Sequence, residues 1–210
     1  MGSPEASIVE ASTLPARDRD MTMATAIDTI LTRRSASTRF LAEPVPDAAQ
    51  LDLIVRAAAT APDHKRLRPY RFILIAQSRR GDLAKAFREA KLDRNPDATP
   101  DDLSRAADKA LKGPMLIAIV LKIIRDHPRV SVTDQMLTAG AALENMLLAA
   151  AALGFGHCLR SGQSATSRRV REAMDIATDE ELAAFLLLGT PTRPALARDD
   201  DVSDLLSIWD

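Results

Sequence analysis

The chain has little cysteine and few aromatic residues. Cys158 is its only cysteine, which excludes an internal disulfide and argues against a cysteine-based zinc site. Aromatic residues make up 3% of the 210 residues while hydrophobic residues together make up 46%, so the core must consist mainly of Ala, Leu, Ile and Val, with helices dominant. This apolar content excludes a disordered chain, and a lone thiol is compatible with a reducing, cytoplasmic setting.

Excess charge and long apolar runs are also missing. A formal net charge of −1 supplies no general field for nucleic acid, so any anion site must be a local cluster of arginines. The longest unbroken apolar stretches, Met115–Leu121 and Met146–Leu153, fall far short of the roughly 20 residues that cross a bilayer. We therefore expect neither a nucleic-acid partner nor a membrane span.

Chain length predicts one domain with an extension at each end. A mass of 22.8 kDa is enough for one substantial core and too little for two comfortable domains. Residues 1–22 hold two prolines, several charges and no apolar signal-peptide core, so we expect a disordered extension that is neither a secretion nor a mitochondrial signal. The domain is expected over residues 23–195, and an acidic tail over residues 196–210.

Hydrophobic periodicity and capping residues predict helices that alternate with short strands. The expected helices are Ala24–Thr32, a helix that begins at Asp47 and ends before Pro62, Asp82–Leu92, Asp101–Leu111, Ser131–Leu153 and Thr166–Asp175. The expected strands are Arg71–Ala76, Met115–Leu121 and His157–Arg160. Glu181–Leu188 is apolar enough for a strand, although the preceding Thr178-Asp179-Glu180 mimics a helix cap. Because no strict βαβ period repeats, this order favours an α+β sandwich around one mixed sheet flanked by helices.

The helix expected over Ser131–Leu153 is apolar on nearly every side. Such a helix should be buried all round. Glu144 interrupts its apolar surface, and a buried carboxylate should find a partner in the core or at a subunit interface. Gly154 is the expected left-handed stop.

Four short segments carry the functional signal. The first, Arg33-Arg34-Ser35, offers guanidinium forks and a hydroxyl to a phosphate. The others run from Ala61 to Phe72, around Asp63-His64-Lys65, then from His157 to Gly162, and from Phe185 to Pro191. Each one alone is a weak signal, since an Arg-Arg-Ser after a helix is most often a solvated helix end.

In that order and spacing, the four segments resemble the nitroreductase family of FMN-dependent NAD(P)H oxidoreductases, from about Ala24 to Pro191. The resemblance implies a nitroreductase-like sandwich, a strand at Glu181–Leu188, and a homodimer with flavin at an interface made by both chains. The loop also resembles a subgroup that carries Asp-His-Lys. Where the family usually has Asn, one residue, then Gln-Pro-Trp, this chain has Arg66, Arg68, Pro69 and Tyr70.

The resemblance also implies which residues contact FMN. Arg33, Arg34 and Ser35 would hold the phosphate and ribityl part, and His64 or Arg68 would place a polar group at the pyrimidine edge, where a cation stabilises the anionic reduced flavin. His64 is about as readily interpreted as a solvated loop side chain. The full expected set is Arg33, Arg34, Ser35, Thr60, His64, Arg68, Leu159, Arg160 and Ser161.

No side chain is expected to act as a catalytic acid or base or as a metal ligand. Hydride reaches a flavin without proton transfer from the protein, so the flavin carries the chemistry. Asp126-His127 lacks a third ligand at any metal spacing, and Cys158 is expected to be a small buried hydrophobe.

The sequence therefore favours an FMN-dependent oxidoreductase that takes hydride from NADH or NADPH. It would reduce a small-molecule acceptor, such as a nitroaromatic, a quinone or an enone, by a ping-pong mechanism. One alternative is a flavin-binding or small-ligand-binding protein without NAD(P)H turnover, which the unusual Arg66 and Arg68 motivate. Another alternative, on the same fold, consumes the flavin or a halogenated ring as its substrate.

Overall fold

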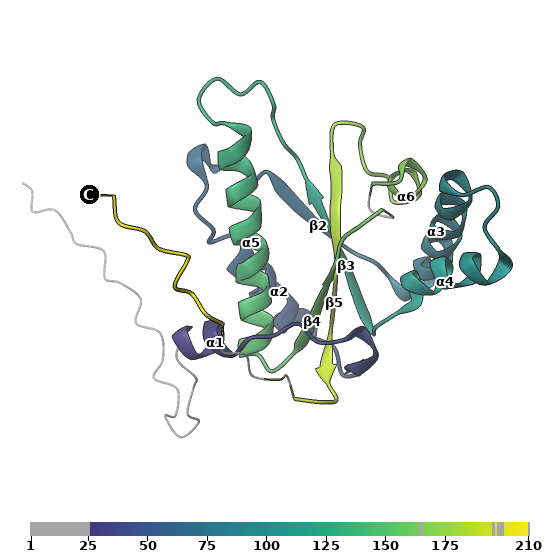
Figure 1. The fold of residues 1–210 in the computed structure, drawn as a ribbon, viewed down its shortest axis with the longest axis horizontal. Helices are drawn as coiled ribbons and strands as arrows, with labels where there is room; N and C mark the ends of the chain where they lie inside the picture. The colour runs from purple at the N-terminus through teal and green to yellow at the C-terminus, as the bar shows by residue number, and fades with distance from the viewer. Residues whose placement is uncertain (1–25, 164–165, 195, 197–199, 210) are drawn as a thin grey trace, which may run out of the picture.

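A five-stranded sheet forms the centre of the molecule, with helices on both of its faces (Figure 1). This computed structural model describes residues 26–163, 166–194, 196 and 200–209, so the extension expected over residues 1–22 lies outside the described residues. The strands are β1 (Leu41–Ala42), β2 (Tyr70–Leu74), β3 (Met115–Leu121), β4 (Gly156–Arg160) and β5 (Glu181–Pro191). The helices are α1 (Ala26–Thr32), α2 (Ala48–Ala58), α3 (Arg80–Arg94), α4 (Pro100–Leu111), α5 (Val132–Ala152) and α6 (Arg168–Ala173), with short 3-10 turns at Thr38–Phe40, His64–Arg66 and Gln77–Arg79.

The strands follow the order β1-β5-β3-β2, and β4 pairs with β5 next to β1. Leu41 lies opposite Pro191 and Gly156 lies opposite Gly189, so β1 and β4 follow one another along the same edge of β5. Every pairing among the described strands is antiparallel. The α+β class is confirmed, but the expectation of a mixed sheet is wrong, because the alternation of helices and strands does not fix the direction in which each strand returns.

Both faces of β3 are covered, which explains its unbroken apolar sequence. Leu116, Ala118 and Val120 face a cluster with α3, α4 and α6. The alternate residues, Met115, Ile117 and Ile119, face a second cluster with α2 and α5.

Local signals placed most element ends correctly. The predicted cap of α2 is present: the Asp47 carboxylate accepts the backbone N–H of Gln50 at 2.8 Å, and the Gln50 side chain accepts that of Asp47 at 3.0 Å. The helix-like signal before β5 has another use, because the Glu180 carboxylate accepts two hydrogen bonds from Arg71 at 2.7 and 2.6 Å. β5 is accordingly a strand, as the family resemblance implied.

Helix α5 is not buried all round, which corrects the expectation from its composition. Leu137 is 68% exposed and Met136 is 47% exposed, because the sheet and α2 cover only one side of the helix in a single chain. Glu144 is also half-exposed, and its partner is Arg33 of the same chain, at a part-exposed position and not in the core. In the part of the chain that the structure describes, no helix combines the length and apolarity required to cross a membrane.

Candidate functional site

The Arg33-Arg34-Ser35 segment follows α1 and runs beside β4. The backbone N–H of Ala36 donates to the carbonyl of His157 at 2.8 Å, which fixes the segment alongside this strand. Gly156 permits the close approach, since a Cβ there would lie 2.8 Å from a Leu41 methyl carbon. The segment thus joins two of the four sequence signals, the arginine pair and the His157–Gly162 stretch.

The two arginines of this segment have different surroundings. Arg33 donates from Nε to the Glu144 carboxylate of α5 at 3.0 Å, and its side chain is about a quarter exposed. Among the described residues, Glu144 engages one of the five guanidinium N–H donors, through Nε, which leaves the Nη groups for a ligand. Arg34 donates from Nη1 to the carbonyls of Leu31 and Arg33, at 2.8 and 2.7 Å, and closes the end of α1. Arg33 is therefore the better placed of the two to hold an anion.

His157 lies beneath this segment and is 1% exposed. Burial, and then the nearby Arg33 charge, lower the pKa of its imidazole from 6.5 to about 4. Neither ring nitrogen has a hydrogen-bond partner among the described residues. The ring is therefore neutral at neutral pH, and the positive charge at this edge of the sheet belongs to the arginines.

A cavity of about 250 Å³ opens at the other end of β4, between the sheet and helices α3 and α4. Its floor is apolar, and its wall includes Arg160, Ser161 and Gly162 from the end of β4; Arg160 and Ser161 are among the residues expected to contact FMN, whereas Leu159 does not line the cavity. The floor residues are Phe87, Leu116, Phe185 and Leu187. His157 and Arg160 are three residues apart on an extended strand, so roughly 10 Å separates the Arg33 region from this cavity.

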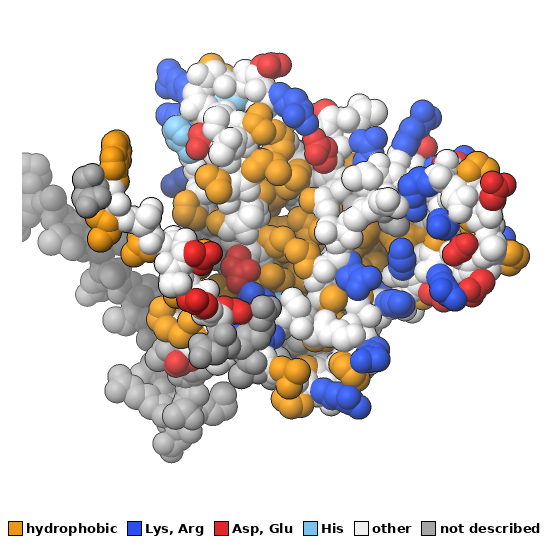
Figure 2. All heavy atoms as spheres, viewed as in Figure 1, with side chains coloured by type: hydrophobic (Ala, Val, Ile, Leu, Met, Phe, Trp, Pro, Cys, Tyr) orange, Lys and Arg blue, Asp and Glu red, His pale blue; other side chains and the backbone are white. Residues whose placement is uncertain are grey.

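Three further cations line the cavity that sequence reasoning did not assign to the site. They are Arg94 at the end of α3, and Lys109 and Lys112 at the end of α4. None of the described residues that line the cavity is acidic. Figure 2 shows Lys and Arg side chains gathered on the side of the molecule that carries α3, α4 and α6. The available signal was a cation at the end of each of two consecutive helices, α3 and α4, of which α4 precedes the core strand β3.

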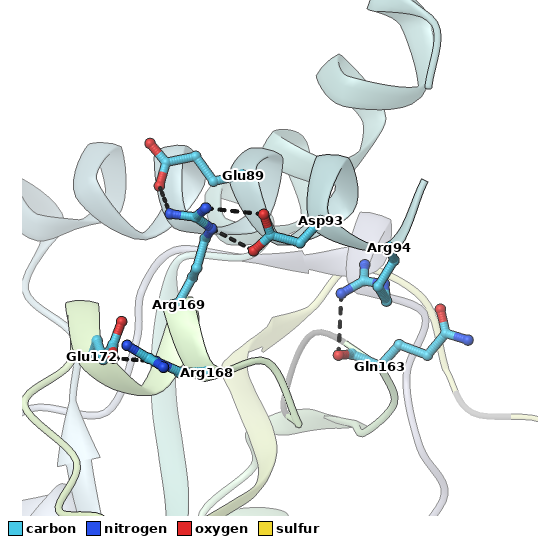
Figure 3. Close-up of polar contacts among 7 residues, drawn as sticks. All are labelled: Glu89, Asp93, Arg94, Gln163, Arg168, Arg169 and Glu172. Atoms are coloured by element: carbon cyan, nitrogen blue, oxygen red, sulfur yellow. Dashed lines mark hydrogen bonds and ion pairs between the residues drawn. The ribbon is translucent and has the colours of Figure 1, made fainter. Parts of the chain in front are cut away.

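Ion pairs link α6 to the last turns of α3, next to Arg94 of the cavity wall (Figure 3). Arg169 of α6 bonds to Asp93, with one N–H···O distance of 2.9 Å, and lies 3.6 Å from Glu89. The hydrogen bond from Arg169 lowers the pKa of Asp93. Arg94 donates to the carbonyl of Gln163 at 3.4 Å, which ties the loop after β4 to α3.

A buried arginine at the start of α3 holds the end of α4 in place. Arg80 is 2% exposed and donates to the carbonyls of Ala110, Lys112, Gly113 and Pro114 at 3.1 to 3.2 Å. Burial lowers its pKa. These carbonyls belong to a helix end and its turn, where the last groups have no partner inside the helix. Arg80 therefore positions the turn that carries Lys112 into the cavity wall.

The loop between α2 and β2 has an unusual backbone. Lys65, Arg66 and Arg68 adopt left-handed conformations, with φ of 65, 52 and 46°. The Asp63 carboxylate supports this loop, because it accepts the backbone N–H of Leu67 at 3.1 Å and that of Arg68 at 2.7 Å. Such conformations cost of order 1–3 kcal/mol each for residues other than glycine, and they cluster at functional sites.

This loop is attached to a different face of α5 from Arg33. Thr138 of α5 donates to the carbonyl of Pro62 at 2.9 Å, and Asn145 donates to the Thr60 hydroxyl at 3.2 Å. Thr138 and Asn145 are seven residues apart and share a helix face, whereas Glu144 lies about 100° around the helix. One chain thus brings Arg33, Ser35, Leu159, Arg160 and Ser161 to one edge of the sheet. The same chain places Thr60, His64 and Arg68 on the loop beside the Thr138–Asn145 face of α5.

Comparisons with known proteins agree with the sequence resemblance. A model of the Nitroreductase family matches residues 30–190. "Putative NAD(P)H nitroreductase YdjA" of Escherichia coli is 36% identical over 166 residues, which span 79% of this chain and 88% of that protein. "Putative NAD(P)H nitroreductase" of Haemophilus influenzae is 34% identical over 162 residues, which span 77% and 86% of the two chains.

Solved structures share the fold at lower identity. The nitroreductase-like family protein from Bacillus cereus has a TM-score of 0.74 at 18% identity, over 90% of this chain and 98% of that chain. A variant of the FMN and NADPH-dependent nitroreductase NfnB from Sphigopyxis sp. strain HMH has a TM-score of 0.69 at 15% identity, over 89% and 99%. The family model spans most of the chain and the curated relatives are more than a third identical, so the protein belongs to the nitroreductase family, a family of oxidoreductases.

Proposed function

We propose that the protein is an FMN-dependent oxidoreductase that takes hydride from NADH or NADPH and reduces a small organic acceptor, such as a nitroaromatic or a quinone. The observation that carries the proposal is the cavity with an apolar floor and cationic walls on the α3 and α4 side of edge strand β4, with Arg33 at the other end of β4, where it pairs with α5 on the opposite side of the sheet. A planar apolar ring with a phosphate on a flexible arm suits this arrangement. The names of the related proteins, which mention NAD(P)H and FMN, point to the same chemistry.

The residues present fit FMN in type as well as in place. Arg33 and Ser35 would hold the phosphate, since a guanidinium and a hydroxyl both donate to phosphate oxygens. The backbone of Ser161 and Gly162 would meet the edge of the ring above the apolar floor. When bound, FMN supplies the acceptance and donation of hydride. Lys109 adds positive charge near the ring, which favours the electron-rich reduced form.

We propose that the site is completed by a second copy of the chain in a twofold dimer. Thr60, His64 and Arg68 lie on another face of α5, and the partner's copy of this loop would supply the polar contacts to the ring that the Asp-His-Lys subgroup implies. An apolar face is available for such an interface. Its exposed side chains are Ile27, Ile30 and Leu31 of α1 and Met136 and Leu137 of α5. Exposed apolar side chains of this kind on neighbouring helices are typical of an association site.

In this mechanism the protein binds and orients. The cationic wall holds the ring against the apolar floor, which keeps one face covered and excludes water there. The dinucleotide and the acceptor must use the remaining face in turn. Alternate occupancy of one site forces a ping-pong order and requires no protein acid or base for hydride transfer.

The domain limits of 23–195, the flanking extensions and a cytoplasmic location remain predictions from the sequence.

Anaerobic spectroscopy tests this function. NADH or NADPH should bleach the visible flavin absorption of the purified protein, and a quinone or nitroaromatic should restore it. Steady-state rates with both substrates varied should give parallel double-reciprocal lines. A flavin that dithionite reduces but excess NADH and NADPH do not would overturn the enzyme proposal and favour a flavin-binding protein without turnover.

A further inference from the structure

The cavity beside β4 carries an excess of positive charge. Arg94, Lys109, Lys112 and Arg160 line it, and all four residues are exposed. None of the four forms an ion pair with a described residue. Asp93, next to Arg94 in the chain, is already paired with Arg169 of α6. The cavity therefore presents uncompensated cations around an apolar floor.

FMN accounts for only part of this charge. In the proposed function Arg33 and Ser35 hold the phosphate, and Arg33 pairs with α5 on the opposite side of the sheet. The flavin ring is neutral when oxidised and carries one negative charge in its anionic reduced form, which Lys109 balances. Even where Arg160 also contacts FMN, as the sequence resemblance implied, two cations are left without a counter-charge. The molecule that shares the cavity with the ring is the natural source of that counter-charge.

The two remaining cations, Arg94 and Lys112, stand on parts of the chain that are held in place. Arg94 at the end of α3 donates to the carbonyl of Gln163 at 3.4 Å. Lys112 follows α4, and its carbonyl accepts a hydrogen bond from the buried Arg80 at 3.1 Å. The Lys112 ammonium group itself makes no hydrogen bond to a described residue, so it is available to a ligand. Cations on a fixed backbone bind an anion better than cations on a mobile loop, because less ordering is required on binding.

We propose that the acceptor is an aromatic acid: a planar ring that lies on the open face of the flavin and carries a carboxylate or similar acidic group toward Arg94 and Lys112. The inference rests on the proposed function, because the flavin defines the face on which the acceptor binds, and it names the class of acceptor. Cations that surround a cavity attract such a molecule and repel an organic cation.

The acidic group serves in binding and is unchanged by the reaction. For a nitro acid the overall step is Ar–NO2 + NAD(P)H + H⁺ → Ar–NO + NAD(P)⁺ + H2O. The coenzyme is oxidised by two electrons, one N–O bond of the nitro group breaks, and its oxygen leaves as water. The proton comes from solvent, so the step requires no acid or base from the protein.

Three nearly isosteric ligands test the charge preference without turnover. Near neutral pH, 4-aminobenzoate carries one negative charge, 4-aminobenzamide none and 4-aminobenzamidine one positive charge. Calorimetry on the FMN-loaded protein should show the acid bound roughly tenfold tighter than the amide, because a partly exposed ion pair contributes up to about fivefold and two cations face the acid. The amidine should bind most weakly, and added salt should reduce the preference. Equal affinities for the three ligands would overturn the proposal.

Matched variants separate the cavity from the general surface charge. Lys112→Gln should lower the ratio of acid to amide affinity by roughly two- to fivefold, and Lys112→Glu should lower it further. Lys85→Gln is the control, because Lys85 is an exposed residue of α3 that does not line the cavity. It lies two residues, and so about 200° around the helix, from Phe87 of the floor. An equal loss in Lys112→Gln and Lys85→Gln would contradict a specific acid site.

Turnover of 4-nitrobenzoate and 4-nitrobenzamide extends the test to acceptors. A carboxylate withdraws electrons less than an amide, so electronic effects alone favour reduction of the amide, and a lower KM for the acid reports binding. FMN content and bleaching by NAD(P)H are measured on the same samples. Bleached flavin without a preference for the acid would overturn this inference alone. A flavin that NAD(P)H does not bleach, in a protein that still prefers 4-aminobenzoate, would support the acid site and overturn the proposed function.

Discussion

At the scale of single residues, Arg33 and Arg34 are neighbours with different roles. Arg34 bonds to the last carbonyls of α1, the ordinary use of a cation at a helix end, whereas Arg33 turns toward α5 and β4. Both were expected to hold the phosphate. We propose that the larger contribution comes from Arg33, because its hydrogen bonds leave its guanidinium away from the end of α1.

Replacement of Arg33 by Ala should weaken FMN binding by about 1.5–3 kcal/mol, one to two decades in dissociation constant, because it removes a charge-assisted contact. Flavin content after purification and titration of the apoprotein measure the effect. Arg34→Ala should have a smaller effect. Arg56→Ala, which breaks an exposed pair with Asp52, and Cys158→Ser should retain flavin. Retention of wild-type affinity in both Arg33→Ala and Arg34→Ala would show that the phosphate binds elsewhere.

His157 should make stability depend on pH. Its folded pKa of about 4 lies below the ordinary 6.5, so the unfolded chain binds the extra proton between these values and stability falls as pH drops through this window. The loss amounts to about 3 kcal/mol at pH 4. His157→Phe keeps an aromatic ring without the unpaired nitrogens and should remove this component. Denaturant unfolding of the wild type and of His157→Phe at pH 4.5 and 7 tests this. If the stability difference between the two pH values were the same in both proteins, the buried neutral imidazole would be contradicted.

The sequence revealed some site residues better than others, for a physical reason. Arg33, Ser35 and Arg160 stand in short polar segments at element ends, where a change of pattern marks them. Lys109 lies in the last turn of α4 and Lys112 directly follows this helix, where a cation ordinarily stabilises the helix dipole, so a cation at this helix end does not by itself distinguish a cavity residue. Their role emerges only when α4 packs against the sheet and turns them into the cavity.

At the scale of elements, the fold uses one buried side chain to place a functional helix end. Arg80 at the start of α3 binds the carbonyls that end α4, so the two helices hold each other while Arg94 and Lys112 face the cavity. For α5, the sequence pattern predicts where the helix begins but not which of its sides are exposed. Ser131 and Asp134 predicted its start correctly, but the extent of its exposure depends on which neighbours pack against it, and composition does not contain that information.

Arg80→Met should destabilise the fold by about 3 kcal/mol, because several buried carbonyls lose their donor at once. FMN affinity should fall as well, since the turn that carries Lys112 loses its support. The adjacent Arg79→Met is a matched control: Arg79 is mostly exposed and its one ion pair among the described residues is with Asp82, so a change within about 0.5 kcal/mol is expected. Chemical denaturation and flavin titration measure both effects. Similar stability of the two variants would show that the Arg80 network is energetically unimportant.

At the scale of the whole molecule, the proposed flavin site is divided between two chains. One edge of the sheet carries Arg33, Ser35 and Arg160, and the strained loop with His64 and Arg68 is attached to another face of α5. Twofold pairing across the exposed apolar face would place each loop against the partner's edge. Light scattering should therefore report about twice 22.8 kDa at micromolar concentration.

Complementation between two defective chains tests this division most directly. One chain carries Arg33→Ala with Arg34→Ala, the other carries His64→Ala with Arg68→Ala, and neither alone should retain FMN. After the chains are mixed and their dimers exchange, half of the dimers pair one chain of each kind, and each such dimer has one site with both halves intact. Roughly one quarter of all sites should then bind FMN and be bleached by NAD(P)H. No recovery of flavin, with exchange verified by mass spectrometry, would contradict a site shared between two chains.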